Sequence, residues 1–125
     1  MRPKNIVIPL VIYPFDIMFS FGETDKQLEN RLSNHGVNVD EEKHYLFTNH
    51  TELGRTCVFS GGQTLIRMKR LPQTCNDFGT LQHEIFHSVE FLMERIGVKH
   101  SVDCGECYAY LIGYITEQVY KTMNL

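Results

Sequence analysis

The stretch TCNDFGTLQHEIFHSVEFLMERIG, residues 74–97, decides the fold that this sequence predicts. Apolar residues recur in it at intervals of three and four, which predicts an amphipathic helix with one continuous apolar stripe. Thr74 and Asp77 have the approximate spacing of a capping box at its start, and Gly97 stands where a left-handed residue commonly ends a helix. The stripe consists of Phe78, Leu81, Ile85, Val89, Leu92 and Ile96.

Two histidines lie four residues apart in this predicted helix, within the segment HEIFH of residues 83–87. At about 100° per residue, His83 and His87 project from one side of the helix, so both imidazoles can reach one metal ion. That side is roughly opposite the apolar stripe and should face a cleft or solvent. This histidine pair predicts a zinc site; the alternative is two exposed histidines that bind no metal.

Glu84 stands beside the histidine pair and is the candidate general base. Zinc lowers the pKa of a bound water toward about 7 and polarises a carbonyl group, while a neighbouring carboxylate can take the proton and pass it on. A purely structural zinc site does not require such a carboxylate. Glu84 therefore favours an enzyme over a structural protein.

The third zinc ligand is expected on the following helix, which the sequence predicts over residues 103–122 with Asp103 and Glu106 as a capping pair. A catalytic zinc usually takes three protein ligands and keeps one position for water. Glu106 is the first candidate. Tyr110, one turn further on, can donate a hydrogen bond to a developing oxyanion or pack between the helices, and Gly113 on the same stripe would permit close helix approach. Weaker candidates for the third ligand are Asp103, Glu90 and Glu117.

The cysteines Cys104 and Cys107 support a different kind of zinc site. Together with the histidine pair they have the ligand count of a closed structural site, in which no water remains to react. A redox role for these two cysteines lacks the surrounding strand-helix-strand pattern. The remaining cysteines, Cys57 and Cys75, are expected to be small buried apolar residues.

The N-terminal half should supply a sheet and a backing helix. Residues 6–15 are rich in β-branched and aromatic types and predict a first strand, which its prolines mark as an edge or an interrupted strand. A helix should begin at Thr24, which has capping-box spacing with Gln27, and end near residues 34–36.

A hairpin should complete the sheet. Residues 44–48 and 55–60 are short strand candidates, and Gly61-Gly62 predicts a tight turn before a strand over residues 63–69. Apolar and polar residues alternate in this last strand. One of its faces should therefore pack inward and the other should meet solvent or a ligand.

The composition is that of an ordinary globular protein and fits one domain, residues 1–125. A net charge of -3 and the sparse clustering of basic residues argue against a nucleic-acid partner. No stretch has the roughly 18 uncharged apolar residues of a membrane helix, so no membrane partner is expected. The N-terminal apolar run does not fit a signal peptide, because it contains Pro9 and Pro14 and is followed closely by Asp16. We therefore expect a soluble protein that is cytoplasmic or virion-associated.

At these residues the chain resembles the zincin-like metallopeptidases, whose shared motif is His-Glu-x-x-His on an active-site helix. The match of His83, Glu84 and His87, with Glu106 on a later helix, is similar to the glutamate-completed branch, the gluzincins. The segment ECYAYLIGY, residues 106–114, also looks like small metallopeptidase-type proteins encoded by bacteriophages.

The resemblance implies an α+β, zincin-like fold with a small, mostly antiparallel sheet packed against the helix of the histidine motif and a second C-terminal helix alongside. The strand over residues 63–69 would be the sheet edge along which extended substrate lies. The implied function is hydrolysis of a peptide bond in a peptide or protein substrate. Zn2+ would be held by His83, His87 and Glu106, and the catalytic residues would be Glu84 and Tyr110.

The chain departs from the resemblance in its length. Larger zincin peptidases add a second subdomain that walls the substrate cleft, and 125 residues leave no room for one. An open groove or a partner chain would then complete the cleft. Alternatively, the protein is a non-catalytic structural or interaction protein of the same fold, for example a component of a virus particle.

Overall fold

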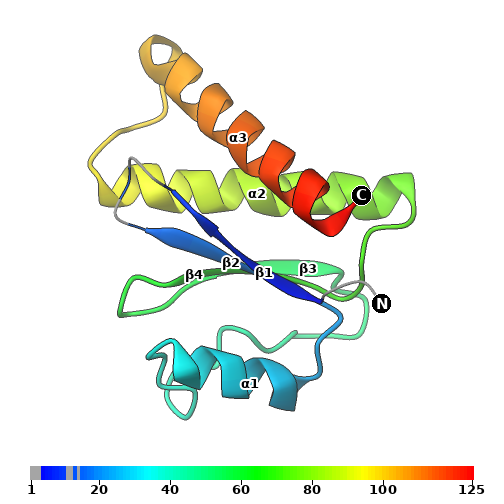
Figure 1. Ribbon diagram of the computed structural model, residues 1–125. Coiled ribbons are helices and arrows are strands. Elements are labelled where there is room, and N and C mark those ends of the chain that lie inside the picture. Colours follow the sequence, from blue (N-terminus) through cyan, green and yellow to red (C-terminus); the bar gives the residue numbers. More distant parts are fainter. Residues whose placement is uncertain (1–3, 11–12, 14) are drawn as a thin grey trace.

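The computed structural model describes residues 4–10, 13 and 15–125 and has the α+β fold that the sequence predicts. One four-stranded sheet lies between two layers of helix, with α1 on one face and α2 and α3 on the other (Figure 1). The elements in chain order are β1 (Asn5–Pro9), β2 (Asp16–Phe21), α1 (Asp25–Asn34), β3 (Gly54–Val58), β4 (Thr64–Met68), α2 (Cys75–Arg95), a 3-10 turn (Val102–Cys104) and α3 (Gly105–Met123).

The sheet is mixed, with the strand order β1-β2-β4-β3. The outer pairs β1–β2 and β3–β4 are antiparallel, while β2 and β4 pair in parallel at the centre. A parallel pair needs a long connection, which α1 and the segment after it provide. The expectation that the strand before α2 forms the sheet edge is wrong, because β4 is an inner strand and the two edge strands are β1 and β3.

The prediction of one strand over residues 6–15 is wrong in its second half, because β1 ends at Pro9 and the chain returns as β2. Residues 11, 12 and 14 of that prediction lie outside the described residues. Sequence analysis missed β2 because five of its six residues are buried, so the strand has no alternation of apolar and polar faces.

The predicted hairpin is confirmed: β3 and β4 pair antiparallel, and Gly62 in the turn has a φ of 96°, which favours glycine. Residues 44–48 contain turns and no strand. The expected alternation in the last strand is wrong, because all five residues of β4 are buried. Both faces of this inner strand are covered by other parts of the chain, α1 and the segment after it on one side and α2 on the other.

The starts of α1 and α2 follow the predicted capping boxes. Thr24 and Gln27 exchange two hydrogen bonds at the start of α1, and Thr74 and Asp77 do the same at the start of α2. Gly97 follows α2 with a φ of 82°, as expected of a left-handed residue after a helix. The third predicted capping pair is wrong, because a 3-10 turn precedes α3 and the N-cap of α3 has no side-chain cap.

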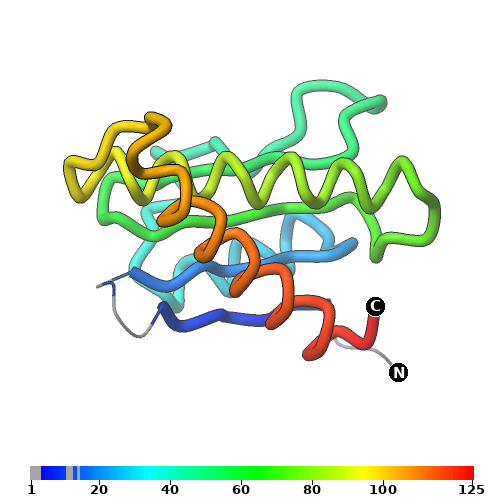
Figure 2. The backbone as a smooth tube through the Cα atoms, turned by 90° about the horizontal axis from the view of Figure 1, so that it is seen from above, coloured from blue at the N-terminus to red at the C-terminus, as the bar shows by residue number. Residues whose placement is uncertain are grey.

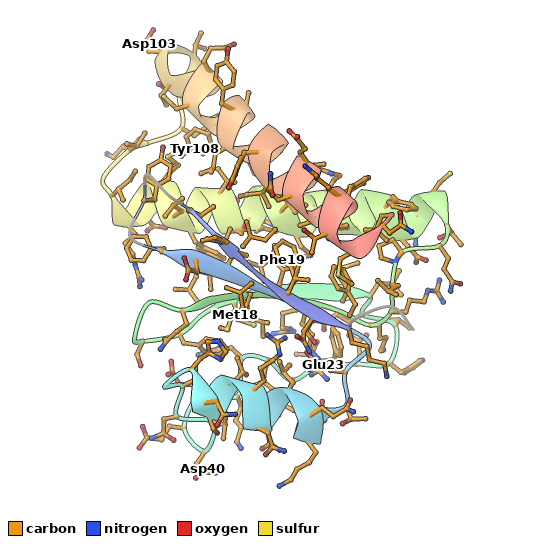
Figure 3. The ribbon with its side chains drawn as sticks, viewed as in Figure 1. Met18, Phe19, Glu23, Asp40, Asp103 and Tyr108 are labelled. Carbon is orange, nitrogen blue, oxygen red and sulfur yellow. The ribbon has the colours of Figure 1, made fainter. Side chains whose placement is uncertain are left out.

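Two apolar clusters fill the two sides of the sheet. Phe19 belongs to the cluster beneath α2 and α3, and its neighbour Met18 belongs to the cluster that α1 covers (Figure 3). The α2 helix contacts β3 and β4, whereas α3 crosses over β1 (Figure 2). Within the described ranges, no helix is long and apolar enough to span a membrane.

The predicted apolar stripe of α2 is buried in its central part. Leu81, Ile85, Val89 and Leu92 are buried, Phe78 is half-buried and Ile96 is exposed. The stripe therefore fixes the rotation of α2 on the sheet and leaves the opposite side of the helix, which carries the histidine pair, on the outside.

Candidate metal centre

The histidine pair forms a close contact on the outer side of α2. The Nε2 atoms of His83 and His87 lie 3.0 Å apart, with ring centroids 4.6 Å apart. Two nitrogens that bind one tetrahedral zinc at about 2.0–2.1 Å are about 3.3 Å from each other, so the observed spacing fits a shared metal ion with a small adjustment. His83 is exposed and His87 is half-exposed, as expected from their helical phase.

The carboxylate of Glu90 contacts the second ring nitrogen of His87. Its Oε1 lies 2.8 Å from His87 Nδ1. An ionised carboxylate only accepts hydrogen bonds, so Nδ1 carries a proton and the Nε2 of a neutral ring keeps its lone pair on the side of His83. Metal-binding histidines commonly have such a carboxylate behind them. The sequence indicated Glu90 only as a weaker candidate for the third ligand; its spacing of three residues from His87 was the signal for this contact.

Glu84 points toward the edge strand β3. Only 7% of the residue is exposed. The hydroxyl of Thr56, on β3, lies 2.9 Å from Glu84 Oε1 and 3.0 Å from the backbone oxygen of Glu84. Sequence analysis did not identify Thr56, because nothing in the local sequence relates residue 56 to residue 84.

A cleft of about 730 Å³ runs between the first half of α2 and the segment that leads into β3. Both His83 and Glu84 line it. On the other side lie Leu53 and Gly54, and a Cβ added to this glycine would be 3.2 Å from Glu84 Cγ. The absence of a side chain at residue 54 therefore lets β3 approach α2 closely. This cleft gives a ligand access to one histidine and to the candidate base.

Glu106 is not brought together with the histidine pair. It is exposed near the start of α3, on the side of the helix opposite the buried Tyr108. Within residues 4–10, 13 and 15–125, no group of three or more His, Cys, Asp or Glu side chains is arranged to hold one metal ion. The weaker ligand candidate Asp103 lies in the 3-10 turn at the far tip of α3 (Figure 3).

The stripe of Glu106, Tyr110, Gly113 and Glu117 exists but faces solvent. Tyr110 is 76% exposed, so it neither reaches the cleft nor packs between helices. A Cβ added to Gly113 would meet nothing within 4 Å, so this glycine does not serve a close helix approach. Instead, α3 packs through Tyr108, Leu111, Ile115, Val119 and Met123.

The cysteines do not gather around the histidine pair either. Cys104 Sγ donates to the backbone oxygen of Lys99 at 2.7 Å, Cys107 is exposed, and all four cysteines are free thiols. Cys57 is buried as predicted, and burial raises the pKa of its thiol to about 12. The same prediction is wrong for Cys75, which is exposed at the start of α2 and lines the cleft.

Comparison of the chain with protein-family models, with curated proteins and with solved structures finds no match.

Proposed function

We propose that this protein is a zinc-dependent hydrolase of peptide bonds, in which His83 and His87 hold the metal and Glu84 is the general base. The observation that carries the proposal is the 3.0 Å separation of the two Nε2 atoms, with a carboxylate behind one ring. An exposed pair of unrelated histidines has no need of either feature. The proposal also assigns the α+β fold to the zincin-like class.

Two features support Glu84 as the general base: it follows His83 directly on α2, and it lines the cleft together with His83. When bound at the histidine pair, zinc would supply a water of lowered pKa and polarise the substrate carbonyl. Glu84 lines the cleft and has one oxygen engaged with Thr56, which leaves the second oxygen to accept a proton from the attacking water and to deliver it to the leaving amine.

The open edge of β3 suits an extended peptide. Two backbone hydrogen bonds flank the β3–β4 pair: Lys69 donates its N–H to Leu53 O, and Phe59 donates its N–H to Gln63 O. Because hydrogen-bonded positions alternate along an antiparallel pair, the odd-numbered residues of β3 direct their backbone groups to β4. Gly54, Thr56 and Val58 therefore turn their backbone N–H and C=O groups outward. An extended substrate can pair with these groups while it lies beside Glu84.

The experiment that tests the function measures bound zinc and peptidase activity in wild type and in the Glu84→Gln and Cys104→Ser variants. We expect one zinc per chain in all three. Activity should fall by at least about 100-fold only in Glu84→Gln, because general base catalysis is lost. Glu94→Gln is the matched control, since Glu94 is an exposed carboxylate on the same helix.

Two results would overturn the proposal. Wild type without stoichiometric zinc would leave a fold with structural or interaction roles, and a Glu84→Gln variant with full activity would remove the proposed base. Loss of zinc from Cys104→Ser would instead identify the closed structural site.

A further inference from the structure

Thr56 is the β3 side chain that bonds to Glu84. A hydroxyl carries one proton, and its two acceptors here, the carboxylate Oε1 and the backbone oxygen of Glu84, lie at 2.9 and 3.0 Å. With Glu84 ionised, the carboxylate is the stronger acceptor and takes the bond. Both acceptors lie within hydrogen-bond distance of the Thr56 oxygen. Rotation of the hydroxyl alone can therefore switch its hydrogen bond from one acceptor to the other.

This bond matters because Glu84 is a buried, flexible side chain. Because the residue is only 7% exposed, its carboxylate needs a hydrogen bond to offset the loss of water. Glutamate also has several rotatable bonds, so without an anchor its carboxyl group would sample several positions beside the cleft. A fixed oxygen on the β3 side directs the other oxygen toward the space where a substrate would lie.

Gly54, two residues earlier on β3, makes the space for this arrangement. A Cβ added there would lie 2.8 Å from Met68 Sδ on β4, 3.1 Å from Thr80 Cγ2 and 3.2 Å from Glu84 Cγ. The glycine therefore admits the Glu84 side chain between strand and helix, and Thr56 fixes its end.

We propose that Thr56 is a positioning residue that holds Glu84 in the orientation needed for proton transfer. The Thr56 hydroxyl fixes Glu84 Oε1 on the β3 side, so that Oε2 would be the oxygen that takes a proton from the attacking water and passes it to the leaving amine. This inference rests on the function proposed above and adds the residue through which the edge strand acts on the general base.

The side chain and the backbone of Thr56 have separate tasks, which makes the inference testable. Its side chain points to α2, whereas its backbone groups face the open edge where substrate would pair. Thr56→Val removes the hydroxyl and keeps the shape, so kcat should fall about 10- to 100-fold through misplacement of Glu84. Bound zinc should stay at the wild-type level, and KM should stay within about twofold.

Thr56→Ser restores the hydroxyl and should return kcat to within about threefold of wild type. Thr116→Val is the matched control, because Thr116 bonds to Gln82 of α2 on the side away from the cleft. An unchanged kcat in Thr56→Val, or a Thr56→Ser variant as slow as Thr56→Val, would overturn the inference.

A second measurement does not depend on activity. With ¹³C-labelled glutamate carboxyl groups, the Glu84 resonance, assigned through Glu84→Gln, should move in Thr56→Val and stay in place in Thr56→Ser. If zinc-loaded wild type hydrolyses no peptide, the proposed function is wrong, and this resonance alone decides whether Thr56 positions Glu84. A Glu84 resonance that is the same in wild type, Thr56→Val and Thr56→Ser would overturn the inference about Thr56.

Discussion

His87 is the better anchored of the two histidines, because Glu90 fixes the proton on its Nδ1 atom. In the contact between the two rings, His83 then donates its Nε2 proton to the lone pair on His87 Nε2. Zinc needs both lone pairs, so His83 must move its proton to its own Nδ1 while His87 is already in the correct tautomer. If the pair binds zinc as proposed, Glu90 is the residue that sets His87 in the tautomer that the metal requires.

Removal of the Glu90 carboxylate should weaken zinc binding without removing a ligand. We expect Glu90→Ala to raise the zinc dissociation constant about tenfold, the usual effect of losing a carboxylate behind a ligand. Competition with a chromophoric chelator measures this constant. Glu94→Ala, one turn further along the exposed face, should leave it unchanged. Equal zinc affinity in the two variants would contradict this role for Glu90.

The start of α2 depends on a buried carboxylate. Asp77 accepts hydrogen bonds from the Arg70 guanidinium and from the backbone N–H groups of Gln73 and Thr74. The bond from Arg70, followed by that from Gln73, holds the pKa of Asp77 well below its usual range. The helix that carries the histidine pair is therefore fixed at its first turn by a charge.

This charge gives the stability a defined pH dependence. Because the pKa of Asp77 is lower in the folded state than in the unfolded state, its contribution is fully present above about pH 5 and is lost as pH falls toward the lowered pKa. Asp77→Asn should lower Tm at pH 7, and its difference from wild type should shrink between about pH 5 and pH 2. Thermal melts followed by circular dichroism measure this. A constant difference would contradict it, and Asp103→Asn, at an exposed position, is the control.

The orientation of α3 leads to a prediction about Glu106. In the described structure this carboxylate faces solvent, so Glu106→Gln should leave the zinc dissociation constant within about twofold of wild type. The same chelator competition measures it. A loss of tenfold or more would mean that α3 turns on metal binding and brings Glu106 to the histidine pair, as the resemblance to gluzincins implies.

Local patterns predicted the helices better than the strands. The two capping boxes, the apolar stripe of α2 and the outward side of the histidine pair all depend on residues within a few positions of each other. By contrast, distant parts of the chain bury both faces of β2 and β4. These strands therefore lack the alternation of apolar and polar residues that would have shown which of their faces is buried. The contact between Thr56 and Glu84 spans 28 residues and required the fold.

At the scale of the whole molecule, Arg67 connects the sheet to the layer that contains α1 and the segment after it. From β4 it donates to Tyr45 O at 2.6 Å, to Glu23 O at 3.1 Å and to Asp25 Oδ1 at 2.7 Å. Its guanidinium also lies 4.7 Å from the ring centroid of Phe47. The buried Arg67 side chain thus connects the central sheet with the start of α1 and with the segment that follows α1. Further along the chain, that segment forms one wall of the cleft.

Arg67→Met should lower the free energy of unfolding by about 2 to 3 kcal/mol, because two backbone oxygens lose their donor. Urea denaturation measures this change. Asp25→Asn tests the ion pair alone and should cost less than about 1 kcal/mol, since the Asp25 side chain is 60% exposed. Equal costs for the two variants would contradict the view that the backbone bonds dominate.

The parallel pairing of β2 with β4 has a consequence for the order of folding. The β1–β2 pair and the β3–β4 hairpin are each local in the sequence, but the sheet joins them only when the chain between residues 22 and 63 has closed into a loop. Closing such a loop has an entropy cost that local contacts do not repay, so this step should be slow. Because α2 packs across both β3 and β4, the side of this helix that carries the histidine pair is fixed relative to β1 and β2 only when that loop has closed.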